Sequence, residues 1–270
     1  MTMAMHDILD EIVAHKRIEV ARQKESLSVA EIHRLVEKEL TDGGRDTLSM
    51  RRSLEHSASG IIAEFKRKSP SKGWIHEDAR VEDVAPQYSQ GGASAISILT
   101  DEHYFGGDMQ FITRVRGDVT VPILRKDFII DEYQLFQARL IGADAVLLIA
   151  ADLTKQECKS LAHTAHELGL ETLLETHSEH ETDYITDDID MVGVNNRNLG
   201  TFVVDVENSF RMIRHLPTDR TLVSESGISD VDTIRSLRAV GYRGYLIGEN
   251  FMKTSDPGAS LRQFVNMVEA

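Results

Sequence analysis

The chain has 270 residues, of which 41% are hydrophobic and 27% charged, a composition typical of a packed globular protein and not of a disordered one. Its 30 Lys and Arg residues against 44 Asp and Glu residues give a net charge of −14, which argues against a general nucleic-acid binder. The single cysteine, Cys158, excludes an intrachain disulfide and a cysteine-based zinc site. The start lacks the apolar segment of a signal peptide, and the longest apolar run (145–151) is too short to span a bilayer, so we expect a soluble, cytoplasmic protein without membrane partners.

Residues 1–58 are predicted to form a helical extension. Ile8, Ile12 and Val13 recur at helical spacing, and a second helix over 29–40 follows the candidate N-cap Ser28. Turn residues at 41–44 then break the pattern. This segment alone has too little core to fold, so we expect it to pack on the domain that follows.

From residue 59 to residue 270 the sequence predicts an α/β domain in which short buried strands alternate with helices. The eight predicted strands cover residues 61–65, 95–99, 121–124, 145–149, 171–174, 191–194, 221–223 and 245–247. Such alternation indicates a parallel sheet, and eight units indicate a closed (β/α)₈ TIM barrel. The alternative, an open doubly wound sheet, normally has a G-x-G-x-x-G turn after its first strand, and none follows residue 65.

Charged and amide side chains gather where the predicted strands end. Alternate strand residues of a barrel point inward, and its chemistry lies at the carboxyl ends of the strands. The inward positions there are Glu64, Lys66, Lys126, Glu175, Asn195 and Glu225. Any one of them could simply be exposed at a strand end. Because isolated buried charge is costly, several at separate strand ends favour mutual pairing or a charged ligand.

Basic residues cluster directly after the first strand. They are Lys66, Arg67, Lys68 and Lys72, with Ser69 and Ser71 as further donors. Capture of an anionic substrate and a solvated loop explain this cluster equally well.

Glycines follow the last two strands, where barrels often bind phosphate through backbone N–H groups. These turns are Ser226-Gly227 and Gly248-Glu249-Asn250, although plain turns would look the same. Arg197 could bind phosphate or carboxylate. Phe105, Phe128 and Leu147 could wall an aromatic pocket, with ordinary core packing as the alternative, and no histidine pattern indicates a metal site.

Several blocks of this sequence resemble the signature of the indole-3-glycerol phosphate synthase family. They are IAEFKRKSPSKG (62–73), LTD (99–101), YFGG (104–107), PILRKDF (122–128), GVNNRNL (193–199), SESGI (224–228) and LIGE (246–249). The resemblance runs from about Ile8 to the C-terminus. It implies a carboxy-lyase of tryptophan biosynthesis, and since the chain stops soon after the last strand, we expect the monofunctional form.

The resemblance also implies residue roles. Lys126 would be the general acid that protonates the substrate ketone, and Glu175 the partner acid/base in dehydration. Lys66 would contact the substrate carboxylate, while Glu64 and Glu225 would orient the lysines and substrate hydroxyls. We expect the neighbouring Lys66 and partial burial to lower the pKa of Lys126, with the glutamates opposing this.

The remaining implied roles concern substrate binding. Asn195, counted with the catalytic group, and Arg197 would hold the substrate. The phosphate would lie among Ser69, Ser226, Gly227, Gly248 and the backbone of Glu249. The sequence departs from the expected family pattern at Trp74, Asn250 and Phe251, which leaves the packing of the phosphate loops open.

The implied reaction closes the ring of 1-(2-carboxyphenylamino)-1-deoxyribulose 5-phosphate, with loss of CO₂ and water, and needs no metal or organic cofactor. The implied partners are this small phosphosugar–anthranilate substrate and other tryptophan-pathway enzymes. Two alternatives stay open: another phosphosugar barrel enzyme such as phosphoribosylanthranilate isomerase, and a barrel that binds a metabolite without turning it over.

Overall fold

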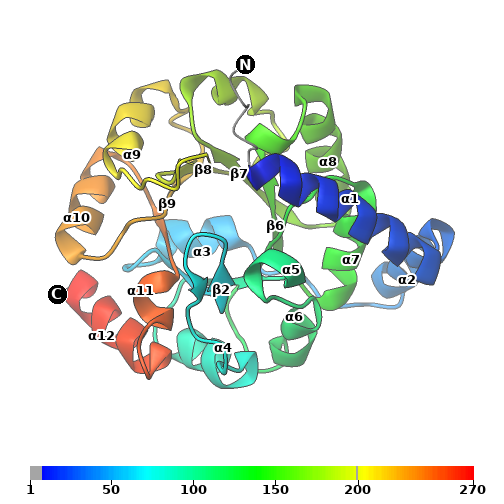
Figure 1. Ribbon diagram of the computed structural model, residues 1–270, viewed down its shortest axis with the longest axis horizontal. Helices are drawn as coiled ribbons and strands as arrows, with labels where there is room; N and C mark the ends of the chain where they lie inside the picture. Colours follow the sequence, from blue (N-terminus) through cyan, green and yellow to red (C-terminus); the bar gives the residue numbers. More distant parts are fainter. Residues whose placement is uncertain (1–7, 199) are drawn as a thin grey trace, which may run out of the picture.

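The computed structural model describes residues 8–198 and 200–270, and its parallel strands close into a barrel (Figure 1). The barrel strands are β1 (Ile61–Phe65), β4 (Ala95–Leu99), β5 (Ile123–Lys126), β6 (Ala145–Ile149), β7 (Glu171–Thr176), β8 (Met191–Asn195), β9 (Thr221–Glu225) and β10 (Gly244–Ile247). Each pairs with its sequence neighbours, and β10 closes the ring on β1. The predicted TIM barrel is confirmed.

Helices surround the barrel and follow its strands in turn (Figure 1). They are α4 (Val81–Gln90), α6 (Gln110–Val115), α7 (Glu132–Ile141), α8 (Lys155–Glu167), α9 (Glu207–Met212), α10 (Val231–Val240) and α12 (Pro257–Glu269). Shorter elements lie in the loops: β2 (Lys68–Ser69), β3 (Gly73–Trp74), α5 (Glu102–Phe105), η1 (Ala150–Asp152), η2 (Glu179–Tyr184), η3 (Ile213–His215) and α11 (Glu249–Met252). Among the described residues, no helix combines the length and apolar character that crossing a membrane requires.

Several strands extend further into polar sequence than predicted. β5 covers Ile123–Lys126 instead of residues 121–124, and β7, β8 and β9 end on polar residues. The charged Arg125 is nevertheless 1% exposed, because its guanidinium lies 2.9 Å from Asp127 Oδ2 and donates to the Gln134 carbonyl at 2.7 Å. Pairing of this kind is invisible to a hydrophobicity pattern.

The barrel has separate inner and outer apolar layers. The inner cluster contains Ile62, Ala95, Leu124, Ala145, Leu147, Leu173, Met191, Val223 and Leu246. Neighbouring strand residues such as Ile61 and Ala63 pack outward beneath the helices. Since side chains alternate along a strand, Glu64, Lys126 and Glu175 continue the inner face toward the carboxyl ends.

The N-terminal extension forms three helices, α1 (Ile8–Ser26), α2 (Val29–Thr41) and α3 (Met50–His56). Ser28 is the N-cap of α2, as predicted, and accepts from the Glu31 amide. The third helix was not predicted. Its Met50 and Leu54 join the inner cluster, so α3 closes the barrel at the end opposite the site. Treating residues 1–58 and 59–270 as parts of one domain stays a prediction.

Candidate active site

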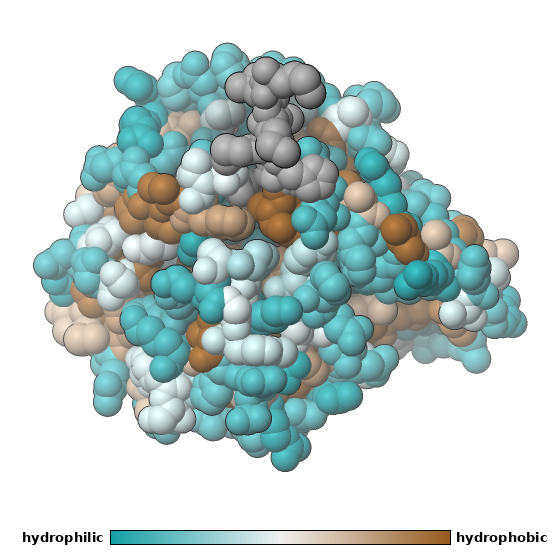
Figure 2. All heavy atoms as spheres, viewed as in Figure 1, coloured by the Kyte–Doolittle hydropathy of each residue, from teal (hydrophilic) through white to brown (hydrophobic). Residues whose placement is uncertain are grey.

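A cavity of about 510 Å³ lies at the carboxyl ends of the barrel strands. Strands and loops all around the barrel supply its walls, and Ile8, Leu9 and Ile12 of α1 line it as well. In Figure 1, α1 begins at the edge of the mouth beside β6 and β7 and runs outward past α8 and α7. The face that carries the mouth is mostly hydrophilic, with apolar patches near its centre (Figure 2). The helical extension is therefore part of the cavity wall.

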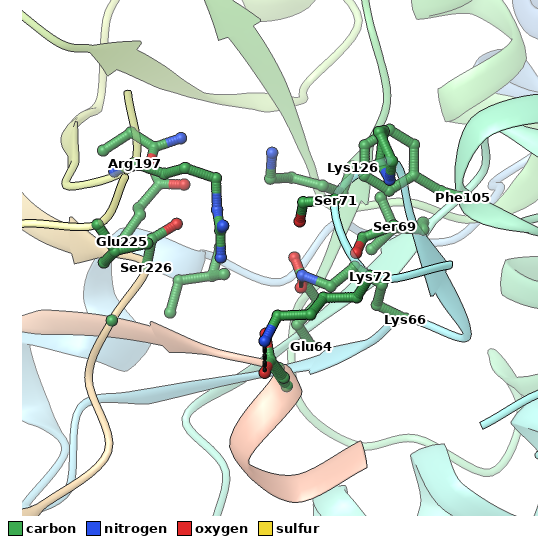
Figure 3. A pocket seen from close by; sticks show the side chains of 18 of the residues that line it. Glu64, Lys66, Ser69, Ser71, Lys72, Phe105, Lys126, Arg197, Glu225 and Ser226 are labelled. Atoms are coloured by element: carbon green, nitrogen blue, oxygen red, sulfur yellow. Dashed lines mark hydrogen bonds and ion pairs between the residues drawn. The ribbon is translucent and has the colours of Figure 1, made fainter. Parts of the chain in front are cut away.

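The strand-end lysines and glutamates meet in this cavity (Figure 3). Lys126 Nζ lies 3.3 Å from Glu175 Oε2, and Asn195 Nδ2 donates to Glu175 Oε1 at 2.9 Å. Lys66 pairs with Glu64 at the carboxyl end of β1. Both Glu64 and Glu175 are 2% exposed. All six residues predicted as a catalytic group, Glu225 included, line one space.

Glu225 is a buried carboxyl group that lies close to Glu175. It is 1% exposed, and its Oε1 has no hydrogen-bond partner within residues 8–198 and 200–270. Burial and the nearby Glu175 and Glu64 charges raise its pKa well above the usual range, while Lys126 opposes this. A Cβ at Gly193 would collide with Glu225 Oε1, and one at Gly248 would collide with Glu64. These two glycines make room for the carboxyl groups, a signal that sequence reasoning missed.

The expectation of a lowered pKa for Lys126 is wrong. Burial does lower the pKa of its ammonium, but the charges of Glu175, Glu225 and Glu64 raise it by more, so the net shift is upward. Lys66 pairs with Glu64 and adds no comparable repulsion at Lys126. The same Lys126 charge contributes to a lowered pKa for Glu175, against the effect of burial. The pair is therefore an ammonium beside a carboxylate.

The basic cluster after β1 divides into two groups. Lys66 and Lys72 line the cavity, with Ser69 and Ser71 between them. Arg67 instead donates to the Gly106 carbonyl at 2.9 Å, and Lys68 donates to the His103 carbonyl at 2.9 Å. These two residues hold the loop against α5, so only Lys66 and Lys72 of the basic cluster face the cavity.

The turns after β9 and β10 border the cavity on its other side. Ser226 and Gly227 adopt consecutive left-handed conformations, with φ of 68° and 79°. Such a conformation is costly for serine and points to a local requirement. Gly248 and Glu249 begin α11, where the first backbone N–H groups have no intrahelical acceptor. All four residues line the cavity, as does Lys253, which sequence reasoning missed.

An aromatic wall is present, with one change to the prediction. The rings of Phe105 and Phe128 lie 6.0 Å apart, and both line the cavity. Leu147 does not line it, because it lies one layer deeper in the inner cluster and is fully buried. Ile149, two residues further along β6, occupies the position expected of Leu147. The assignment of Leu147 to substrate contact is therefore corrected.

The loop after β8 supplies the remaining polar group. The Arg197 side chain faces the cavity (Figure 3). The backbone amide of Arg197 donates to Asn195 Oδ1 at 2.9 Å. Val204 forms an isolated bridge with Arg197 and brings the loop back over the site. Leu199, the last residue of the GVNNRNL block, lies outside the described residues.

The three residues that depart from the expected family pattern lie in different parts of the structure. Trp74 belongs to the small β2–β3 hairpin, where the Arg67 guanidinium and the Lys68 ammonium lie 5.5 and 5.6 Å from its ring. Asn250 lines the cavity, whereas Phe251 is fully buried. Only Asn250 therefore borders the proposed phosphate region directly.

The fold and this cavity define the class of protein. A closed barrel of eight parallel strands, with paired ammonium and carboxylate groups at its carboxyl-terminal mouth, is a TIM-barrel enzyme. A mutant α subunit of tryptophan synthase from Pyrococcus furiosus gives TM-score 0.59 at 15% identity, with 78% of this chain and 97% of the other covered. KGPDC from Streptococcus mutans gives TM-score 0.59 at 11% identity, with coverage of 77% and 96%. At these identities the likeness concerns the fold.

Sequence comparison then gives the family. The sequence model for indole-3-glycerol phosphate synthase matches residues 9–264. The indole-3-glycerol phosphate synthase of Bacteroides thetaiotaomicron is 57% identical over 98% of this chain and 100% of its own length. That of Aliarcobacter butzleri is 40% identical, with 96% and 98% covered. The chain belongs to the indole-3-glycerol phosphate synthase family.

Proposed function

We propose that this chain converts 1-(2-carboxyphenylamino)-1-deoxyribulose 5-phosphate to indole-3-glycerol phosphate, CO₂ and water, as a carboxy-lyase of tryptophan biosynthesis. The observation that carries the proposal is the contact of Lys126 with Glu175, 3.3 Å apart in a cavity that other charged side chains surround. Family membership supports the same reaction.

Two anchors would fold the flexible substrate into a reactive shape. Ser226, Gly227 and the start of α11 at Gly248 and Glu249, with Ser69 opposite, would bind the phosphate. Lys66, whose ammonium pairs with Glu64, would bind the ring carboxylate. Holding both ends brings the ring carbon that bears the carboxylate to the ketone carbon, which removes much of the entropic cost of ring closure.

The aromatic end of the substrate needs an apolar surface. Phe105 and Phe128 supply two rings for it, and Leu9 and Ile12 of α1 face the same cavity. Asn195 and Arg197 would hold the sugar hydroxyls between the two anchors. The substrate would therefore lie across the mouth, with its ring beneath the helical extension.

The raised pKa of Lys126 suits a general acid that must be protonated when the substrate arrives. Its ammonium would donate to the ketone oxygen as the new carbon–carbon bond forms. Loss of CO₂ then restores the aromatic ring. Glu175 would serve the dehydration that follows, beside Lys126, while Glu64 orients Lys66 and Glu225 faces the substrate hydroxyls.

A direct assay tests this function. The purified chain is given the anthranilate-derived ketose phosphate, and indole absorbance is followed. We expect turnover by the wild type and a loss of about 10²-fold or more in kcat for Lys126→Met, with substrate affinity changed only a few-fold. Lys155→Met, an exposed lysine at the start of α8, is the control and should keep wild-type activity.

Other outcomes would favour the alternatives. Isomerisation of phosphoribosylanthranilate without an indole chromophore would indicate the isomerase, and substrate binding without CO₂ release would indicate a binding protein. Near-normal turnover by Lys126→Met would remove the general-acid assignment. Association with other tryptophan-pathway enzymes stays a prediction, which co-purification of the endogenous enzymes would test.

A further inference from the structure

The proposed reaction takes up a proton in each cycle. Protonation of the ketone oxygen and its departure as water use two protons, and loss of a hydrogen from the carbon that becomes indole C2 returns one. Since the carboxylate leaves as neutral CO₂, one proton must enter from solvent for every product formed. This inference rests on the proposed function, because it uses that reaction's stoichiometry.

The substrate itself would obstruct proton entry through the main cavity. Glu175, the proposed acid/base, is 2% exposed, and its Oε2 faces the Lys126 ammonium. Its Oε1 accepts from Asn195 Nδ2. A substrate anchored at both ends would cover this side of the carboxylate. A second route to Glu175 would therefore have to come from behind the β8 strand end.

His177 lies on that route. Its Nε2 is 3.4 Å from Glu175 Oε1, and its Nδ1 is 3.7 Å from Glu181 Oε2. One carboxylate thus faces each ring nitrogen. His177 does not line the main cavity but lines a second cavity of about 710 Å³, together with Glu181. The two cavities share Leu9, Asn195 and Arg197 as their dividing wall.

Local contacts hold the backbone of His177 in place, while neither ring nitrogen makes a hydrogen bond within residues 8–198 and 200–270. The Glu181 carboxylate accepts the amides of His177 and Ser178, and Asn208 Nδ2 donates to the His177 carbonyl at 3.2 Å. The charged groups that face the ring are Glu175, Glu181 and Lys126. Burial lowers the pKa of His177, but Glu181 and Glu175 raise it by more than burial and Lys126 lower it. An imidazole between two carboxylates can carry a proton in at one nitrogen and out at the other.

We propose that His177 relays protons between the second cavity and Glu175. The Nε2–H bond breaks as an O–H bond forms on Glu175 Oε1, and an N–H bond forms at Nδ1 with the proton that Glu181 delivers. Exchange of the ring N–H protons with solvent between turnovers restores the Nε2–H tautomer. Glu181 takes the replacement proton from solvent in the second cavity and delivers it to Nδ1. No electrons are lost or gained. His177 acts through Glu175 and is a positioning and relay residue.

The test compares the His177→Asn variant with two other variants. Glu181→Gln keeps an oxygen to accept the backbone amides but cannot carry the proton, and His180→Asn changes an exposed histidine of the same η2 segment. Wild-type turnover is measured first, so failure of the proposed function would show there and not in the variants. For each variant, kcat, KM, the solvent deuterium isotope effect on kcat and rescue by added imidazole are measured.

We expect His177→Asn to lower kcat about tenfold or more, with KM within a few-fold of wild type. Its isotope effect should rise, and imidazole, which fits the second cavity, should restore part of kcat in a saturable way. Glu181→Gln should change in the same direction and His180→Asn should not. Wild-type kcat in His177→Asn would overturn the relay, as would a lost kcat with an unchanged isotope effect and no imidazole rescue.

Discussion

The α1 helix is fixed to the barrel mouth by a buried lysine, and replacing that lysine should have a large and calculable effect. Lys16 is fully buried, and its ammonium lies 2.9 Å from Asp101 Oδ2, 2.9 Å from Asp127 Oδ1 and 2.8 Å from Glu19 Oε2. Asp101 and Asp127 follow the ends of β4 and β5. The Lys16→Met variant would leave both aspartates buried without this counter-charge.

The free energy of unfolding lost with the ion pairs of Lys16 exceeds what burial of the methionine side chain can offset. Removing one partner of a buried ion pair costs about 3–5 kcal/mol, whereas burying the Met side chain contributes about 1.5–3 kcal/mol that the lysine stem already supplies in part. An unfolding entropy of roughly 2.1 cal/mol/K per residue over 270 residues is about 0.57 kcal/mol/K. A loss of about 4 kcal/mol therefore lowers Tm by about 7 °C.

The loss should depend on pH. Burial raises the pKa of Asp127, but Lys16 and Arg125 lower it by more, to about 2. A carboxyl group whose pKa is lower in the folded state stabilises the fold at pH values above its pKa in the unfolded state. This stabilisation disappears as the pH falls toward 2. The difference between wild type and Lys16→Met should therefore be largest near neutrality and should shrink below about pH 4.

Denaturant and thermal unfolding at pH 7 and pH 3.5 measure both effects. The control is Lys24→Met on the same helix, whose half-exposed pair with Asp131 should contribute about 1 kcal/mol or less. If Lys16→Met is no less stable than Lys24→Met at pH 7, or if its deficit grows at low pH, the account of this buried network is wrong.

Two further substitutions test the site. Glu225→Gln should gain stability relative to wild type from pH 5 to pH 9, because burial and Glu175 raise the pKa of Glu225 and a raised pKa loses stabilisation as pH rises. Urea unfolding at both pH values measures the difference in the free energy of unfolding between the variant and wild type. A difference that shifts in favour of wild type as the pH rises would refute this prediction. Ser226→Gly should stay within about 1 kcal/mol of wild type, since relief at φ 68° offsets the entropy of glycine. It should raise KM about tenfold if the hydroxyl binds phosphate, and an unchanged KM would exclude that contact.

The strand pattern predicts most of the barrel and much of the site. Each barrel strand buries a short apolar run, and alternation places Glu64, Lys126 and Glu175 on the inner face. The prediction for Leu147 is wrong because alternation gives the face of a strand but not the depth of a residue within the barrel. Ile149, in phase with it and nearer the carboxyl end, meets the cavity.

Features set by contacts across the chain could not be predicted. The direction of the Lys126 pKa shift depends on three glutamates from other strands, and only the structure gives their relative weight. Helix α3 was missed because its apolar face covers the bottom of a barrel that is built later in the sequence. The sequence left open whether Arg67 and Lys68 belong to an anion site or to a solvated loop, and the structure shows that their partners are carbonyls of the α5 region.

If Lys126 and Glu175 close an indole ring while the ring carboxylate leaves, CO₂ release and indole formation must occur together. A single-turnover reaction of excess enzyme with substrate labelled in that carboxylate measures both, with labelled CO₂ and indole absorbance recorded at once. We expect one CO₂ for each indole formed by the wild type and neither product on the same timescale from Lys126→Met. Bound substrate that yields neither product from the wild type, or CO₂ without indole, would refute these roles of Lys126 and Glu175.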